Sequence, residues 1–115
     1  MKEVSVVVIG FELGVTSETP TSVTVYGRIS TLDFTNPICS EALFIVDSQP
    51  NEPYSITIYG KDLSVESKNN NSIVVKGDVR RFIVKDSKGK ELRNMVILPC
   101  AIALADLLDE NDKPI

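Results

Sequence analysis

The sequence predicts an all-β domain, either a small barrel or a sandwich, and three observations support this class. First, β-branched residues are frequent and gather in short runs, whereas helical periodicity is almost absent. Second, clusters of Pro, Gly, Asn and Ser separate these runs at the spacing typical of all-β folds. Third, 115 residues with 43% hydrophobic residues suit one domain around one core. We therefore expect a single domain over residues 1–115.

Six runs are predicted to be strands, and they span residues 3–13, 22–32, 42–47, 54–59, 72–85 and 92–104. The polar segment 61–71 between the fourth and fifth runs is predicted to hold one helical turn at most. Residues 101–110 have helical propensity, but their first residues also suit a continuation of the sixth strand. An acidic tail is expected over residues 105–115, and no repeat period is evident.

Alternation within the strands predicts which side chains face outward. A strand alternates its side chains between two faces, so apolar residues at every second position mark the inner face. Gly77 falls among the inward positions of the run 72–85, where a glycine predicts a sharp bend of the kind that closes a small barrel. The predicted outward residues are Thr24, Tyr26, Arg28, Ser30, Ser55, Thr57, Tyr59, Lys76, Asp78, Arg80 and Phe82.

Composition argues against most catalytic chemistry. The chain has no histidine, which removes the commonest general base and the commonest metal ligand. Its two cysteines, Cys39 and Cys100, are far apart and form no CxxC pair, so we expect buried thiols, with a disulfide left open. We therefore expect no enzyme activity, no cofactor and no metal. No apolar run approaches the length of a membrane span or suits a signal peptide, so cytoplasmic residence is the default expectation.

Charge is distributed unevenly along the chain. The net charge is −4, but residues 61–93 carry nine cations against five acids, for a local net charge of +4. The flanking segments 1–60 and 94–115 are net acidic. A basic segment within an acidic protein is compatible with polyanion binding, because the local field decides such binding. It is equally compatible with an ordinary solvated surface.

Residues 22–104 resemble an OB-fold, a five-stranded Greek-key barrel. The most telling stretch, residues 71–98, contains an apolar strand with a mid-strand glycine, a basic stretch, a glycine-containing charged loop and a returning strand. It resembles the fourth-strand, loop and fifth-strand unit of single-stranded DNA-binding, primosomal and replication-protein-A-like proteins. Residues 23–29 are similar to the first strand of that fold. The run 3–13 is extra to a minimal OB-fold, and the usual helix between the third and fourth strands is missing or vestigial.

The resemblance implies that this protein binds single-stranded nucleic acid, DNA rather than RNA, on an outer face of the barrel. Such binding needs cations for the backbone and aromatic rings on which bases stack. Three of the candidates, Phe34, Phe44 and Phe82, suit the core equally well. The candidate binding residues are Tyr26, Arg28, Phe34, Phe44, Tyr59, Lys76, Arg80, Phe82, Lys85, Lys88, Lys90 and Arg93.

Two other classes of protein stay open. The overall acidity and the 6% aromatic content favour an OB-like scaffold that binds partner proteins. The apolar residues 4–9 favour this class too, because an uncovered edge strand invites pairing. Such a scaffold would join a second copy or another chain through its N-terminal strand or a C-terminal helix. The third and weaker alternative is a β-sandwich structural or viral protein.

Overall fold

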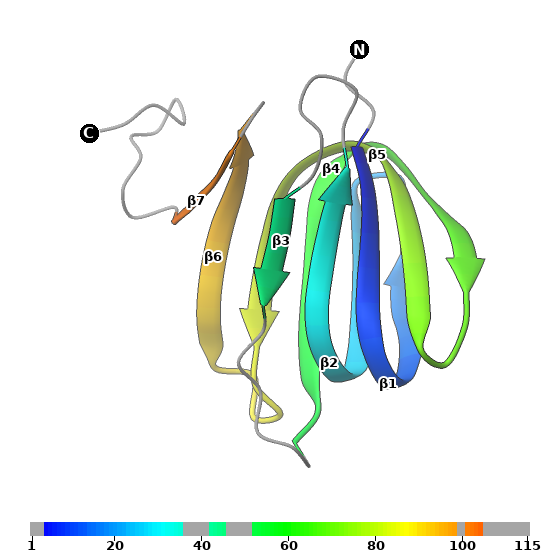
Figure 1. Ribbon diagram of the computed structural model, residues 1–115, viewed down its shortest axis with the longest axis vertical. Helices are drawn as coiled ribbons and strands as arrows, with labels where there is room; N and C mark the ends of the chain where they lie inside the picture. Colours follow the sequence, from blue (N-terminus) through cyan, green and yellow to red (C-terminus); the bar gives the residue numbers. More distant parts are fainter. Residues whose placement is uncertain (1–3, 36–41, 46–51, 99–100, 105–115) are drawn as a thin grey trace.

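The computed structural model describes residues 4–35, 42–45, 52–98 and 101–104 and contains seven antiparallel strands (Figure 1). The predicted class is confirmed, because the domain is an all-β, closed antiparallel sheet consistent with an OB-like barrel. The strands are β1 (Val4–Glu18), β2 (Ser22–Thr35), β3 (Ala42–Ile45), β4 (Tyr54–Lys68), β5 (Ser72–Lys85), β6 (Glu91–Leu98) and β7 (Ala101–Leu104).

Four long strands form a closed ring, in which β1 pairs with β2, β2 with β4, β4 with β5, and β5 again with β1. The N-terminal run, predicted as an addition to the barrel, is thus the strand that closes the ring. Residues 4–9 of β1 pair with β2 on one side and with β5 on the other, so this segment is not an uncovered edge. The short strand β3 extends the ring from β2, and β6 and β7 extend it from β5.

Each long strand bends, and its two parts belong to different layers. We name as layer 1 the paired segments 4–9, 31–35, 60–68 and 72–79, together with β3. Layer 2 consists of the paired segments 10–18, 22–29, 54–59 and 81–85, together with β6 and β7. Strands that switch layers at bends and bulges are how a small sheet wraps around one core.

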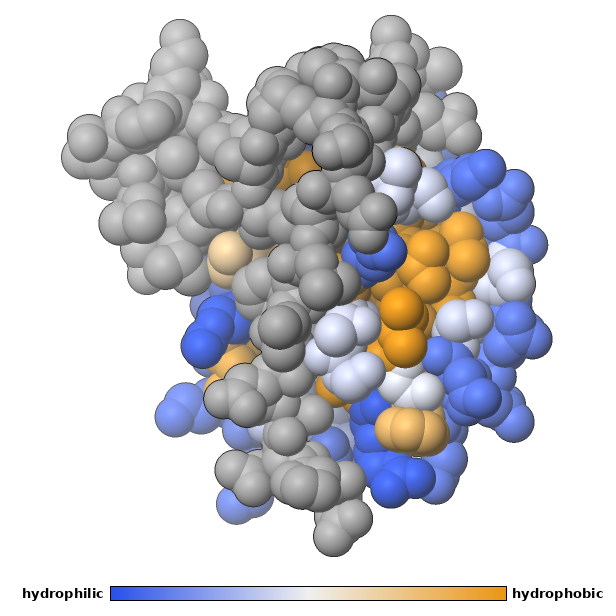
Figure 2. Space-filling view, viewed as in Figure 1, coloured by the Kyte–Doolittle hydropathy of each residue, from blue (hydrophilic) through white to orange (hydrophobic). Residues whose placement is uncertain are grey.

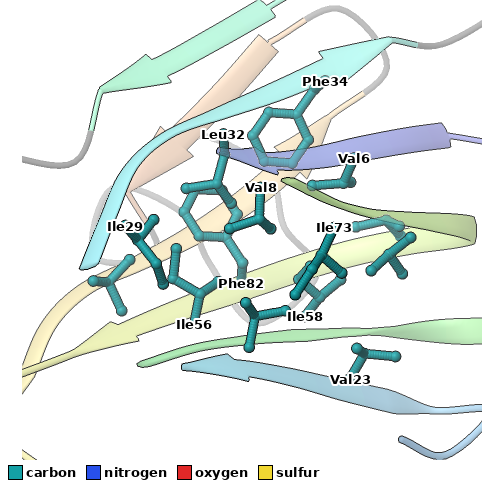
Figure 3. Close-up of a cluster of buried hydrophobic side chains, with 14 of the residues drawn as sticks. Val6, Val8, Val23, Ile29, Leu32, Phe34, Ile56, Ile58, Ile73 and Phe82 are labelled. Carbon is teal, nitrogen blue, oxygen red and sulfur yellow. The ribbon is translucent and has the colours of Figure 1, made fainter. Parts of the chain in front are cut away.

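The core lies between the two layers and consists of alternate apolar residues from all four long strands (Figure 3). Among the described residues, no polar or charged side chain is buried in it. Phe34 of β2 and Phe82 of β5 stack at its centre, with their ring centroids 5.3 Å apart. Burying such large apolar side chains is the main favourable contribution to the stability of a domain of this size.

Glycine makes two of the bends possible. Gly27 has φ +151° and Gly77 has φ +146°, a backbone region that L-residues rarely adopt. A Cβ at Gly27 would lie 2.7 Å from the carbonyl oxygen of Glu12, and a Cβ at Gly77 would lie 2.7 Å from that of Asp62. Gly77 lies opposite a bulge of β4 between Lys61 and Ser64, so the mid-strand glycine marks an irregularity of this strand pair.

Two predicted segments differ in the structure. The stretch expected to hold a helical turn is strand as far as Lys68, because residues beyond Asp62 pair with β5 and Leu63 is buried. The sixth run is divided into β6 and β7, which form an antiparallel pair, so residues 101–104 are strand rather than helix. The predicted tail 105–115 lies outside the described residues, as do Cys39 and Cys100.

The chain contains an internal repeat with an offset of 50 residues, so the prediction that it has no repeat period is wrong. Residues 4–35 and 54–85 align without gaps, and eight of the 32 positions are identical. The identical residues of the first copy are Ser5, Gly10, Leu13, Val15, Ser17, Ser22, Val25 and Gly27. The backbone repeats as well, since Glu12 and Asp62 have φ +55° and +53°, and Gly27 and Gly77 are equivalent.

Candidate nucleic-acid interface

The outer face of layer 2 brings together both predicted tyrosines and two cations. Its central grid consists of three outward positions from each of three neighbouring strands. We name this grid the tyrosine face; it contains Ser22, Thr24 and Tyr26 of β2, Ser55, Thr57 and Tyr59 of β4, and Arg81, Ile83 and Lys85 of β5. None of these nine positions is acidic.

The pairing register fixes the layout of the tyrosine face. Tyr26 lies opposite Ser55, which lies opposite Lys85, and at the other end of the grid Tyr59 lies opposite Arg81. Between these two rows the hydroxyl groups of Thr24 and Thr57 lie 3.0 Å apart. Strand spacings place the two tyrosines about 14 Å apart, four residues along and one strand across. The tyrosines are 43% and 39% exposed, so both rings are accessible for stacking.

The β5–β6 hairpin extends this positive charge beyond one end of the face. Lys85 ends β5, and Lys88 and Lys90 lie exposed in the tip that follows. The tip is ordered by the Asp86 carboxylate, which accepts hydrogen bonds of 2.9 Å from the backbone N–H groups of Lys88 and Lys90. Both lysine side chains thus project from a defined turn.

The four other predicted cations lie outside both the tyrosine face and the hairpin tip. Lys76 is on layer 1, where it pairs with Glu66 at 3.0 Å. Arg28 lies with its Nη2 2.7 Å from Glu12 and its guanidinium carbon 5.7 Å from the centre of the Phe11 ring.

The remaining two cations, Arg80 and Arg93, also contact neighbouring groups. The Arg80 guanidinium donates two hydrogen bonds to Asp78, at 2.9 and 2.8 Å. Arg93 lies exposed on β6 and donates to the carbonyl of Leu92.

Two of the three predicted phenylalanines, Phe34 and Phe82, do not provide stacking surfaces. Phe34 is 4% exposed and Phe82 is fully buried, so both belong to the core, and the outward position that strand alternation predicts for Phe82 is wrong. The physical reason is a bulge in each strand, at Ser30 of β2 and at Arg80 of β5, where the pairing skips one residue. An extra residue reverses the alternation beyond it, and both phenylalanines turn inward. The side chain of Phe44 lies outside the described residues.

The same bulge explains why Arg81, a candidate by its charge, is absent from the list of predicted binding residues. Uninterrupted alternation from Val79 makes Arg81 an inward position, but the bulge at Arg80 turns it outward beside Tyr59. Arg81 Nη1 lies 3.5 Å from Oδ1 of Asn94 on β6. The signal was present in the sequence, because an inward Arg81 and an outward Phe82 contradict the polarity of both residues.

Layer 1 has an equivalent face with different chemistry. The repeat offset of 50 residues relates each position of the tyrosine face to one on layer 1. On layer 1, Ile9 is equivalent to Tyr59 and Thr31 is equivalent to Arg81. Val7 and Val74 are equivalent to Thr57 and Thr24. Figure 2 shows the resulting apolar patch over β1 and β5. The molecule therefore presents one aromatic, cationic face and one polar face that carries an aliphatic cluster of Val7, Ile9 and Val74.

No protein-family model, curated protein or solved structure matches this chain. The part of the chain that the structure describes has no helix with the length and apolarity needed to cross a bilayer. Within the same ranges, Cys, Asp and Glu side chains do not gather in threes that could hold a metal ion.

Proposed function

We propose that this protein binds single-stranded nucleic acid, with DNA favoured over RNA, on the tyrosine face of layer 2. The observation that carries the proposal is the arrangement of Tyr26 and Tyr59 with Arg81 and Lys85 on a nine-residue grid without acidic side chains; Glu91 lies opposite Lys85 at its edge. Exposed rings provide stacking platforms for bases, and the neighbouring cations neutralise phosphates. Lys88 and Lys90 extend this charge along the strand of nucleic acid.

The two exposed tyrosine rings favour a single strand over a duplex. Base stacking on a tyrosine needs an unpaired base whose faces are open, which a duplex does not provide. The separation of about 14 Å between the two rings leaves room for intervening nucleotides over the threonine row. Sequence preference is expected to be weak, because stacking accepts any base.

The first test is Tyr59→Ala in a fluorescence-anisotropy titration with labelled single-stranded DNA. Loss of one stacking platform is expected to weaken binding by about 5- to 150-fold, which corresponds to about 1–3 kcal/mol per stacked base. The matched control is Ile9→Ala, because Ile9 is the equivalent residue on layer 1 and is equally exposed at 39%. If Ile9→Ala weakened binding as much as Tyr59→Ala does, the assignment of the binding face to layer 2 would be contradicted.

The second test measures the salt dependence of binding for Arg81→Gln. Each phosphate contact to a single strand contributes about 0.7 to the slope of log K against log salt, so the slope should become shallower by about that amount. Thr31→Gln, at the equivalent position of layer 1, should leave the slope unchanged. A wild-type chain that binds no oligonucleotide even at low salt would contradict the proposed function altogether.

A scaffold role is the second candidate, and the aliphatic cluster on layer 1 favours it. Ile9 is 39% exposed and Phe11 59% exposed, and Val7 and Val74 are partly exposed beside Ile9. Apolar side chains that cluster on a surface often mark protein contacts. Because residues 4–9 are paired on both edges, such a contact would use the face of β1 rather than its edge.

A further inference from the structure

We propose that residues 4–35 and 54–85 are two copies of one folding unit, and that each copy presents a surface that is complementary to the other copy, as in a symmetric homodimer. The chain would then be a fused pseudo-dimer that does not need the covalent connection between its copies to stay together. Three independent features carry this inference, namely the pairing register, the hydrogen bonds at the turns and one ion pair.

The pairing register between the copies is unchanged when each residue is exchanged for its equivalent 50 positions away. Val4 pairs with Gly77, and the exchange turns this pair into Tyr54 with Gly27, which also occurs. In the same way, the pair Val8–Ile73 becomes the pair Ile58–Val23. Contacts that are exchanged reciprocally define the isologous interface of a twofold dimer.

The turn of each copy hydrogen-bonds to the bend of the other copy. The N–H of Gly10 donates to the carbonyl of Asn71 and the N–H of Gly60 to that of Thr21, both at 3.1 Å. The N–H of Leu13 donates to Asn70 and the N–H of Leu63 to Pro20, both at 2.9 Å. These two pairs of bonds are related by the same offset, although the turns Thr-Pro-Thr and Asn-Asn-Asn share no residue.

The two copies have also become complementary where they differ. Glu18 and Lys68 occupy equivalent positions and form an ion pair at 3.1 Å. A dimer of two copies of residues 4–35 would place two glutamates side by side there, and a dimer of two copies of residues 54–85 would place two lysines. Only the pairing of one copy of each kind is therefore attractive at this position. The core contact between Phe34 and Phe82 also joins residues that differ between the copies. The equivalent of Phe34 in the second copy is Val84, and the equivalent of Phe82 in the first copy is Leu32. A mixed pair is therefore favoured over either pair of identical copies.

The test is a full-length chain with a protease site inserted between Ser48 and Gln49, which is cut after folding. The two fragments are expected to remain one complex in native mass spectrometry at micromolar concentration. Thermal unfolding should become concentration-dependent after cutting, because unfolding then also separates two chains. The uncut insertion variant serves as the reference and should show no such dependence.

Two comparisons make this experiment decisive. The same site inserted between Asn70 and Asn71 lies inside one copy, and cutting there should lower the unfolding temperature more. In the chain cut at 48–49, Glu18→Lys should weaken fragment association by about 2- to 5-fold, and adding Lys68→Glu should restore it. Fragments that separate and unfold after cutting at 48–49, or a double reversal that restores nothing, would overturn the proposal. Neither measurement involves nucleic acid, so the result does not depend on the proposed function.

Discussion

Gly77→Ala is expected to lower the free energy of unfolding by about 2–5 kcal/mol. The new Cβ would lie 2.7 Å from the Asp62 carbonyl oxygen, and φ at this position is +146°. Backbone strain of this kind costs about 1–3 kcal/mol, and steric overlap in a packed region adds a similar amount. Chemical denaturation followed by circular dichroism would measure the change.

Two other glycines provide the controls for this substitution. Gly27→Ala should cost about as much as Gly77→Ala, because Gly27 is the equivalent residue, with φ +151° and the same 2.7 Å approach to a carbonyl. Gly14→Ala should have little effect or stabilise slightly, since a Cβ there meets nothing within 4 Å. Equal stabilities for Gly77→Ala and Gly14→Ala would show that the bend does not require glycine.

Phe82→Ala is expected to reduce the free energy of unfolding by about 3–5 kcal/mol, the usual cost of removing a large aromatic side chain from a core. Phe82 is fully buried and stacks on Phe34 with a centroid distance of 5.3 Å. The same denaturation experiment would measure the loss, with Phe11→Ala as the control because that ring is 59% exposed and should contribute much less.

The burial of Phe82 also predicts how Phe82→Ala affects oligonucleotide binding. Weaker oligonucleotide binding by Phe82→Ala should follow only from loss of folded protein, and it should disappear when binding is normalised to the folded fraction. Tyr59→Ala should behave in the opposite way, with nearly native stability and weaker binding. A folded Phe82→Ala chain of native stability that binds poorly would mean that this ring contacts the ligand after all.

The two layers offer an internal comparison for the proposed function. Equivalent backbone positions carry Tyr59, Arg81 and Lys85 on layer 2 but Ile9, Thr31 and Thr35 on layer 1. The same fold thus provides a candidate binding face and a built-in control face with nearly the same geometry. Differences between matched substitutions on the two faces therefore report on side-chain chemistry rather than on the scaffold.

The sequence by itself determined the all-β class, the irregularity at Gly77 and the exposure of Tyr26 and Tyr59. These features depend on β propensity, strand alternation and the absence of a glycine side chain, all of which act within a few residues. The repeat was also present in the sequence, but eight identities in 32 positions become convincing only when the equivalent residues are seen to pair.

Only the tertiary structure decided which side chains share a face. A bulge arises where one strand has an extra residue opposite its partner, so its position is defined by the pairing. Within one strand, only a reversed polarity such as that of Arg81 and Phe82 indicates it. The bulges at Ser30 and Arg80 buried Phe34 and Phe82 and brought Arg81 beside Tyr59. Closure of the ring likewise depends on β1 pairing with β5, a contact between residues about 70 positions apart in the chain. Such long-range pairing is specified by the packing of the whole core, and local sequence patterns therefore do not reveal it.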